Sequence, residues 1–328
     1  MSKMERLNFM KKTFFTILLI IILFFSSCNT KDKNLKSIDF ILDWYPNTNH
    51  TGLFVAKEKG YFDEIGINFN ILTSPEDSTS DLIINNKAPF GIYFQDSLAV
   101  KLPKTTNITA VAAIIEHNTA GILSLKNKNI ISKENMKNKR FGSYNDPIEI
   151  ALINYLTDKN ITFVPNTDSN SILNLSNNLF DLSLSFYGYD KIMADTMNID
   201  TNFIYLKDLS NNLDFYSPII IANTNYLNNN KEEAIKILQA IKKGYIYAIN
   251  NPEEAAEILI KANPELENNR KFIVESQKYL SSVYATNPDK WGEFDPNRWN
   301  NYYKWLNNQK ILESEIPLNI GFSNEYIK

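Results

Sequence analysis

The chain has 328 residues, of which 44% are hydrophobic and 22% are charged. This composition is typical of a globular protein with two domains or one large one. The formal net charge is −3, so the chain has no overall basic field to attract nucleic acid or anionic lipid, and we expect no nucleic-acid partner.

The N-terminus has the pattern of an export signal. A basic segment, residues 1–12, precedes an apolar run at 13–25 that is shorter than the roughly 20 residues of a comfortable bilayer span. This pattern predicts a signal peptide over 1–28 and a polar tether over 29–36. "SSC" at 26–28 resembles the lipobox of bacterial lipoproteins, in which the cysteine, here Cys28, is lipidated. Phe25 departs from the usual Leu or Val, and an uncleaved membrane anchor is the alternative.

Strands and helices alternate along the rest of the chain. Period-two apolar residues predict a strand at 37–44, and a Gly stop at 60 ends a short helix at 51–59. Further helices are expected at 78–86 and 147–160. Further strands are expected at 67–72, 88–94, 108–115, 120–126, 140–145, 161–166, 180–186, 202–209 and 217–227. This βαβ alternation favours an α/β fold with parallel-rich sheets and helices on both faces.

Two amphipathic helices are expected in the C-terminal part. Residues 230–249 place Ala234, Leu238 and Tyr245 on one stripe, and residues 251–264 begin with Asn251 as N-cap and Pro252 at the first helical position. Two βα runs and a helical tail exceed one core, so we infer two lobes. A site is then expected between them, at the carboxyl ends of strands.

"LDWYPNTNHTGLF" at 42–54 is the first candidate for that site. Asp43 and Trp44 end a strand, and a polar turn that includes Asn47 and His50 follows before the helix. An indole beside carboxylate and amide groups suits a flat heterocycle, because the indole stacks on the ring while the polar groups bind its edge. Alternatively, Trp44 is a core residue, Thr48 or Asn49 is only an N-cap, and His50 is a surface residue.

This stretch resembles the start of the NMT1/THI5-like family, and within it the binding proteins for thiamine pyrimidine precursors. The resemblance continues through "FGIYFQDSLAV", "ITAVAAIIEHNTAGILSLK", "RFGSYNDPIEIALI", "YSPIIIANTNYL" and "KKGYIYAINNPEEAAEIL", over roughly residues 38–262. It implies a two-lobed type II periplasmic-binding-protein (venus-flytrap) fold, with lobe 1 at 37–123 plus 218–328 and lobe 2 at 124–217.

The resemblance also implies a function. It implies an exported solute receptor, for which we expect no enzymatic activity and no cofactor. From the lipobox-like "SSC" we expect the receptor to be lipid-anchored, and we expect it to be monomeric. The receptor would capture formylaminopyrimidine or hydroxymethylpyrimidine at the bacterial cell membrane for the permease and ATPase of an ABC transporter.

Site residues follow from the resemblance position by position. The family stacks the pyrimidine on the tryptophan that corresponds to Trp44, and "SFYGYD" at 185–190 supplies the second aromatic, Phe186 or Tyr187. Asp190 stands where the family has Glu, one methylene longer; alternatively it is a solvated loop or helix-start acid. Weaker candidates lie where strands reach the expected cleft: Tyr93, Gln95, Ser143, Tyr144 and Tyr216. Trp291, Trp299 and Trp305 are expected to pack helices.

Other functions are less well matched. Fungal relatives of this fold synthesise the pyrimidine, but they need a Lys and a His after the strand at 88–94 and a cysteine-rich motif. The chain has "YFQDSLAV" there and one cysteine. Phosphate-binding glycine loops and HExxH are absent from the sequence. The alternatives are a receptor for a sulfonate, taurine, nitrate or riboflavin-like solute, and a surface interaction protein that has lost its ligand.

Overall fold

A computed structural model describes residues 35–73, 78–166 and 171–328. The fold lies in one compact unit, Ser37–Lys328. The expected signal peptide, Cys28 and nearly all of the expected tether lie outside the described residues, so these predictions stay predictions.

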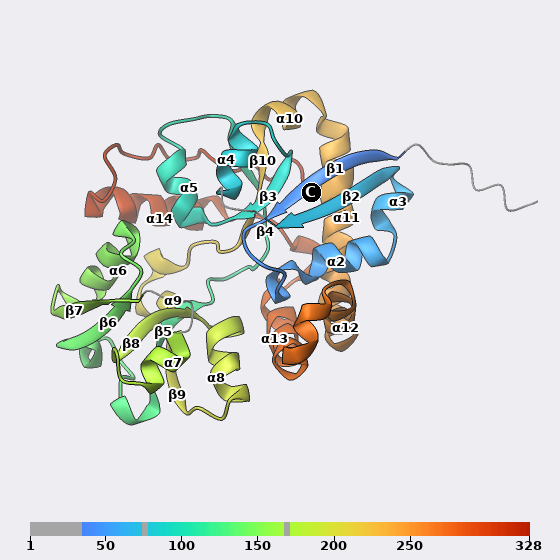
Figure 1. Ribbon diagram of the computed structural model, residues 1–328. Helices are drawn as coiled ribbons and strands as arrows, with labels where there is room; N and C mark the ends of the chain where they lie inside the picture. Colours follow the sequence, from blue (N-terminus) through green and yellow to red (C-terminus); the bar gives the residue numbers. More distant parts are fainter. Residues whose placement is uncertain (1–34, 74–77, 167–170) are drawn as a thin grey trace, which may run out of the picture. The chain divides into compact units, whose positions relative to one another are not determined.

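The described residues form two five-stranded sheets, with strand orders β2-β1-β3-β10-β4 and β7-β6-β8-β5-β9 (Figure 1). We call the first sheet with its helices lobe 1, and the second lobe 2. The strands are β1 (Lys36–Leu42), β2 (Ile67–Thr73), β3 (Phe90–Tyr93), β4 (Ile108–Ala113), β5 (Ala120–Leu125), β6 (Lys139–Ser143), β7 (Ile161–Pro165), β8 (Leu182–Phe186), β9 (Thr201–Tyr205) and β10 (Ile219–Asn223).

Helices surround both sheets. The α-helices are α2 (Thr51–Glu58), α3 (Tyr61–Glu64), α4 (Thr79–Ile84), α5 (Gln95–Lys101), α6 (Pro147–Thr157), α7 (Ser171–Ser176), α8 (Ile192–Thr196), α9 (Leu206–Leu209), α10 (Thr224–Asn229), α11 (Lys231–Asn250), α12 (Pro252–Ala262), α13 (Arg270–Val283) and α14 (Pro296–Gln309). Short helical turns are η1 (Thr48–His50), η2 (Lys126–Lys128), η3 (Glu134–Met136), η4 (Tyr187–Lys191), η5 (Asn211–Leu213), η6 (Pro264–Asn269) and η7 (Pro288–Lys290).

Both sheets are mixed, and in each the antiparallel strand is the one that enters from the other lobe. β1 and β3 are parallel, with Phe40 opposite Phe90, whereas β10 runs antiparallel to both β3 and β4. In lobe 2, β6 is parallel to β7 and β8, and β5 is antiparallel to β8 and β9. Two crossings, β4 to β5 and η5 to β10, join the lobes, as expected for the two-lobed α/β fold.

The lobe boundaries differ from the expected ones in two respects. A boundary after residue 123 would divide β5, a strand of the second sheet, so the first crossing ends before Ala120. In addition, the C-terminal helices do not belong to lobe 1 alone. Helix α13 packs on α11 and α12 of lobe 1 and on η4 and α8 of lobe 2. In α14, Trp305 meets Tyr155 of α6 in lobe 2.

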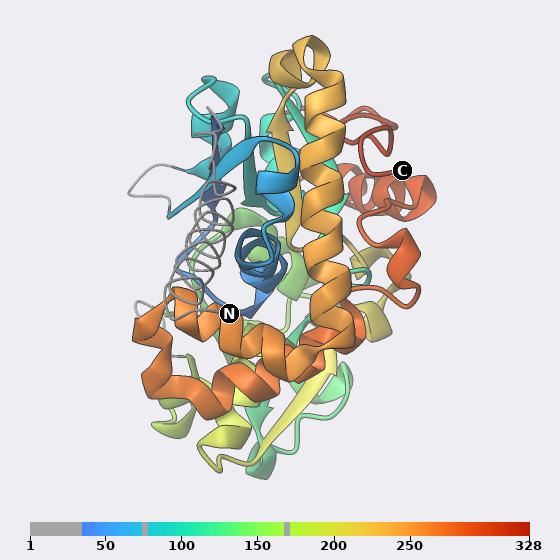
Figure 2. The same ribbon diagram turned by 90° about the vertical axis from the view of Figure 1, so that its right-hand side faces the viewer.

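The long helix α11 confirms the amphipathic pattern, because Ala234, Leu238, Ile241, Tyr245 and Ala248 are all buried. Figure 2 shows α11 as the long upright helix, followed by α12 and α13 at its lower end. Helix α12 begins at Pro252 as expected. The side chain of Asn251, however, does not cap it but donates to the carbonyl of Tyr247 in α11.

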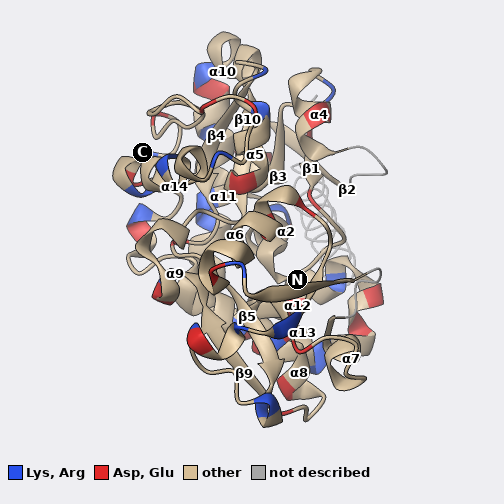
Figure 3. Cartoon of the chain, turned by 90° about the vertical axis from the view of Figure 1, so that its left-hand side faces the viewer, with Lys and Arg blue, Asp and Glu red and all other residues tan. Residues whose placement is uncertain are grey.

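The three C-terminal tryptophans are packing residues, as expected. All three are buried, Trp299 and Trp305 on α14, and Trp291 ahead of it with its ring stacked on Tyr245 at 4.3 Å. Acidic and basic residues are interspersed along the outer helices (Figure 3). Within residues 35–73, 78–166 and 171–328, none of the helices combines the length and apolar character that a membrane crossing requires.

Candidate ligand-binding site

A cavity of about 530 Å³ lies between the lobes, where the strand ends and both crossings converge. This is the place at which open α/β sheets bind ligands, and the volume suits a small molecule. Its lining residues are Asp43, Trp44, Asn47, Thr48, Asn49, Phe94, Ile115, Thr119, Tyr144, Phe186, Gly188, Tyr189, Asp190, Ser217, Pro218 and Leu280.

Trp44 forms part of the lobe 1 wall and is not a core residue. β1 ends at Leu42, and the next turn leaves the indole 45% exposed beside the cavity. The indole meets Tyr189 of lobe 2 edge to face, with ring centroids 5.8 Å apart. Aromatic side chains from both lobes therefore meet at one edge of the cavity, and the exposed part of the indole is available for stacking.

Asp43 is held by a buried histidine. His50 is fully buried, and its Nε2 lies 2.7 Å from Asp43 Oδ1. The backbone N–H of Asn47 donates to His50 Nδ1 at 3.2 Å, so Nδ1 carries no proton and Nε2 is the donor to the carboxylate. His50 thus fixes the carboxylate at the cavity wall without lining the cavity itself, which corrects the expectation that His50 contacts ligand.

The turn after Trp44 is a capping box. The side-chain oxygen of Asn47 accepts from the N–H of Asn49 at 2.9 Å, and His50 accepts from the N–H of Asn47. Tyr245 from α11 donates to the carbonyl of Asn49 at 2.7 Å. These bonds fix η1, so Asn47, Thr48 and Asn49 reach the cavity from a rigid turn.

Lobe 2 contributes the end of β8 and the π-helical turn η4. Phe186, 41% exposed, and Tyr189 line the cavity together with Asp190. Tyr187, at the start of the π-helical turn, does not line the cavity. Its ring packs against Tyr279 of α13, with ring centroids 4.6 Å apart. Of the two expected stacking partners, the structure places Phe186 at the cavity and Tyr187 in the packing behind it.

Asp190 is a carboxylate in a poorly solvated place. Burial raises its pKa from 3.8 to about 6, and the N–H of Phe186 donates to its Oδ2 at 2.8 Å, which partly opposes the shift. Asp190 lies in the first turn of η4, as the helix-start alternative expected, and it also lines the cavity. Perturbed carboxyl groups of this kind concentrate at functional sites.

The cavity is aromatic and acidic. Five aromatic side chains line it, Trp44, Phe94, Tyr144, Phe186 and Tyr189, together with the carboxylates of Asp43 and Asp190. Among the described residues that line it, none is Lys, Arg, His or Cys. In the part of the chain that the structure describes, no group of three or more His, Cys, Asp or Glu side chains could hold a metal ion.

Three further expected site residues are not among those that line the cavity. Gln95 is fully buried, donates to the carbonyl of Trp299 and accepts from the N–H of Tyr216. Tyr216 packs edge to face on Phe294 at 5.0 Å, and Tyr93 stacks on its neighbour in the sequence. Gln95 and Tyr216 are buried and do not line the cavity, which corrects the expectation for these two residues. Tyr93 is half-buried and is not among the lining residues either.

Ser143 and Tyr144 take different roles in one turn. The hydroxyl of Ser143 donates to Glu149 Oε2 at 2.6 Å, and the N–H of Tyr144 donates to the same oxygen at 3.0 Å. Ser143 is buried and does not line the cavity, which corrects that expectation. Tyr144 is 52% exposed and lines it. Glu149 thereby positions the turn that carries this ring.

Sequence reasoning missed several lining residues. Phe94 follows the expected Tyr93 by one position, and strand alternation assigns neighbouring residues to opposite faces, so a shift of one residue reverses the choice. Leu280 lies on α13, far along the chain, and Thr119 lies in the first crossing. Nothing local in the sequence marks these two residues.

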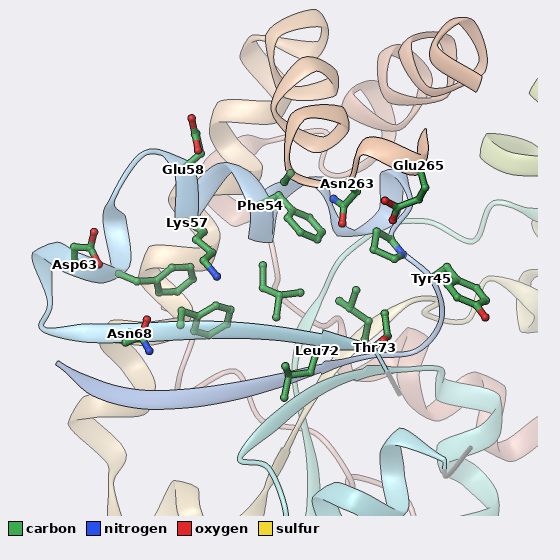
Figure 4. Close-up of a pocket in the computed structure, with 16 residues that line it drawn as sticks. Tyr45, Phe54, Lys57, Glu58, Asp63, Asn68, Leu72, Thr73, Asn263 and Glu265 are labelled. Atoms are coloured by element: carbon green, nitrogen blue, oxygen red, sulfur yellow. The ribbon is translucent and has the colours of Figure 1, made fainter. Parts of the chain in front are cut away.

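A second hollow, of about 890 Å³, lies within lobe 1 (Figure 4). Phe54 and Lys57 reach it from α2, Leu72 and Thr73 from β2, and Asn263 from the chain after α12. All of its lining residues belong to lobe 1, so lobe closure does not act on it. We therefore take the cavity between the lobes as the candidate site.

The comparisons with known proteins agree with this fold. The family model described as "NMT1/THI5 like" matches residues 47–255, more than half of the chain. The chain belongs to the NMT1/THI5-like family.

Two relatives carry different activities in their names. The formylaminopyrimidine-binding protein of Halalkalibacterium halodurans is 24% identical, over 94% of this chain and 97% of its own length. The 4-amino-5-hydroxymethyl-2-methylpyrimidine phosphate synthase of Legionella pneumophila is 22% identical, over 90% of this chain and 94% of its own length.

Solved structures with the same fold include solute receptors. A ligand-binding component of an ABC-type import system from Staphylococcus aureus matches with a TM-score of 0.65 at 14% identity, over 89% of this chain and 98% of that one. The alkanesulfonate-binding protein SsuA of Xanthomonas axonopodis pv. citri, bound to MOPS, matches with a TM-score of 0.63 at 8% identity, over 88% and 98%. At these identities the likeness concerns the fold alone.

Proposed function

We propose that the protein is a solute-binding protein that captures a thiamine pyrimidine precursor, formylaminopyrimidine or hydroxymethylpyrimidine, for import by an ABC transporter. The observation that carries the proposal is the cavity between the lobes, with aromatic side chains on both sides and two carboxylates. An aminopyrimidine has two flat faces for the aromatic walls, and its amino group donates to carboxylate oxygens. The named activity of the Halalkalibacterium relative supports the same ligand class.

The charge of the cavity separates this ligand class from anions. Sulfonate, taurine and nitrate all present anionic oxygens, which proteins bind with Arg, Lys or converging N–H donors. Asp43 and Asp190 would repel such a ligand, and the described residues of the lining include no basic side chain to offset them. The sulfonate-binding neighbours therefore share the fold, and the site chemistry of this chain favours a different solute.

Binding is also favoured over synthesis. The described cavity lining offers no Lys amine, imidazole or thiol as a nucleophile or base. Directly after β3, the residue that lines the cavity is Phe94, which is neither a Lys nor a His. We infer that the ligand leaves unchanged. Incubating the protein with pyridoxal phosphate and analysing the products by mass spectrometry tests this inference, since release of a pyrimidine would overturn it.

Isothermal titration calorimetry on the full chain, purified in detergent, tests the ligand. The titrants are formylaminopyrimidine, hydroxymethylpyrimidine, riboflavin, taurine and nitrate. We expect heat of binding with an aminopyrimidine and none with taurine or nitrate. Tight binding of an anion, or binding of riboflavin alone, would refute the proposed ligand.

We further propose that the protein is exported, lipid-anchored through Cys28, and monomeric. The basic and apolar segments before "SSC" support export and lipidation. Cys28→Ala should move the protein from the membrane fraction to the soluble exported fraction. Immunoblotting of the two fractions measures this change. Growth of strains with and without the protein, when the precursor is the only source of the pyrimidine part of thiamine, tests the transport role.

A further inference from the structure

Helix α13 closes the rear of the cavity and touches both lobes. It packs on α11 and α12 of lobe 1, on the turn η1 that follows Trp44, and on η4 and α8 of lobe 2. Leu280 of α13 lines the cavity between these turns. The helix therefore contacts η1 and η4 at the same time, and these two turns carry opposite walls of the site.

One hydroxyl on this helix bridges the two lobes. Ser276 is fully buried, and its Oγ lies 2.6 Å from Thr48 Oγ1 in η1 and 2.5 Å from the carbonyl oxygen of Gly188 in η4. The carbonyl can only accept, so Ser276 donates to Gly188 and accepts from Thr48. A directed chain of two hydrogen bonds thus runs from lobe 1 through Ser276 to lobe 2.

The two ends of this chain are cavity residues, and its centre is not. Thr48 and Gly188 both line the cavity, whereas Ser276 does not. An opening motion that separates Thr48 from Gly188 must break at least one of the two bonds. Burial makes this loss costly, because water cannot readily replace the broken bond.

Close packing supports the bridge on the lobe 2 side. A Cβ on Gly188 would lie 2.9 Å from Leu280 Cδ2, so η4 approaches α13 more closely than a larger residue would permit. Tyr279 packs on the ring of Tyr187, and its hydroxyl lies 3.2 Å from that of Tyr205. These contacts hold η4 against the helix on both sides of the Ser276 bond.

We propose that Ser276 is a positioning residue that latches the two lobes together and thereby slows ligand release without touching the ligand. The ligand class used to measure this effect rests on the proposed function. The latch itself is a property of the protein without ligand. Loss of one bridging hydroxyl should weaken binding of hydroxymethylpyrimidine about 5- to 30-fold, mainly through faster dissociation.

Ser281 provides a matched control on the same helix. It is also buried, donates to the carbonyl of Ala248 at 2.7 Å and accepts from Gln277 at 2.9 Å, so its bonds stay within α13 and α11. Ser276→Ala and Ser281→Ala each leave one buried carbonyl without its donor. We therefore expect similar decreases in thermal stability, and an increase in the dissociation constant and off-rate for Ser276→Ala alone.

The experiment uses the full chain in detergent, with stopped-flow fluorescence for hydroxymethylpyrimidine release and hydrogen exchange for η4 in the ligand-free protein. Faster exchange at η4 in Ser276→Ala, but not in Ser281→Ala, supports the latch. Equal affinities and equal exchange in the two variants would overturn it. Ser276→Cys, which retains a weak donor, should be intermediate and serves if Ser276→Ala does not fold. If the unchanged protein binds no aminopyrimidine, the proposed ligand is wrong, and the exchange comparison still decides the latch.

Discussion

Replacing Asp190 by Asn should stabilise the ligand-free protein at neutral pH. Burial raises the Asp190 pKa from 3.8 to about 6, so between these pH values the folded chain binds more protons than the unfolded chain. The contribution of Asp190 to the unfolding free energy is therefore most favourable below about pH 4, and this contribution is lost as the pH rises through about 6. The rise in the Asp190 pKa from 3.8 to about 6 corresponds to at most about 3 kcal/mol of unfolding free energy.

Asn keeps the geometry and removes the charge. Its side-chain oxygen can still accept the N–H of Phe186, which now donates to Asp190 Oδ2 at 2.8 Å. Urea unfolding of both proteins at pH 4, 6 and 8 measures the difference in unfolding free energy. We expect almost no difference at pH 4 and a gain of up to about 3 kcal/mol for Asp190→Asn at pH 8. A difference that does not change with pH would refute the assignment of a carboxylate whose pKa is raised by burial.

Three further predictions concern binding of an aminopyrimidine. Trp44→Ala should weaken it roughly 10- to 100-fold by calorimetry, because one stacking face is lost, whereas the adjacent and more exposed Tyr45→Ala should stay within about twofold; equal effects would exclude stacking on the indole. His50→Ala should lower the unfolding free energy by about 1–3 kcal/mol in urea and also weaken binding, because Asp43 loses its buried donor; unchanged affinity would show that the pair is only structural. Affinity should fall as the pH drops below about 6, and this fall should be absent in Asp190→Asn; a parallel fall in both proteins would assign it to another group.

Local sequence patterns predicted all ten strands but only part of the helices. The strands expected at 202–209 and 217–227 run into α9 and α10, and α5, α7 and α8 were not predicted. The alternation of Ile38, Phe40 and Leu42 predicted β1, and Gly60 predicted the end of α2, which the structure places at Glu58. These signals depend on residues close in the chain, so no knowledge of distant contacts was required. The exposed Trp44 could be anticipated for the same reason, because it follows the end of a strand directly.

Side chains at the other strand ends could not be assigned from local pattern. Gln95 and Ser143 are polar residues where a cleft was expected, yet both satisfy buried polar groups in their own neighbourhood. A polar residue at a strand end can face a ligand or pair with the interior, and only the tertiary structure decides which. The π-helical turn η4 similarly places Tyr189 and Asp190 at the cavity and Tyr187 away from it.

Asp190 and Ser276 have opposite effects on the ligand-free site. Asp190 is a partly buried carboxylate with a raised pKa, which lowers the stability of the ligand-free protein at neutral pH, and a ligand N–H donor would offset that cost when it binds. The hydrogen-bonded bridge through Ser276 holds the opposite wall close by. Because that bridge forms without the ligand, less binding energy is needed to order the two lobes, and more remains for discrimination at the ring edge. Selectivity should therefore depend on Asp43 and Asp190, and residence time on α13.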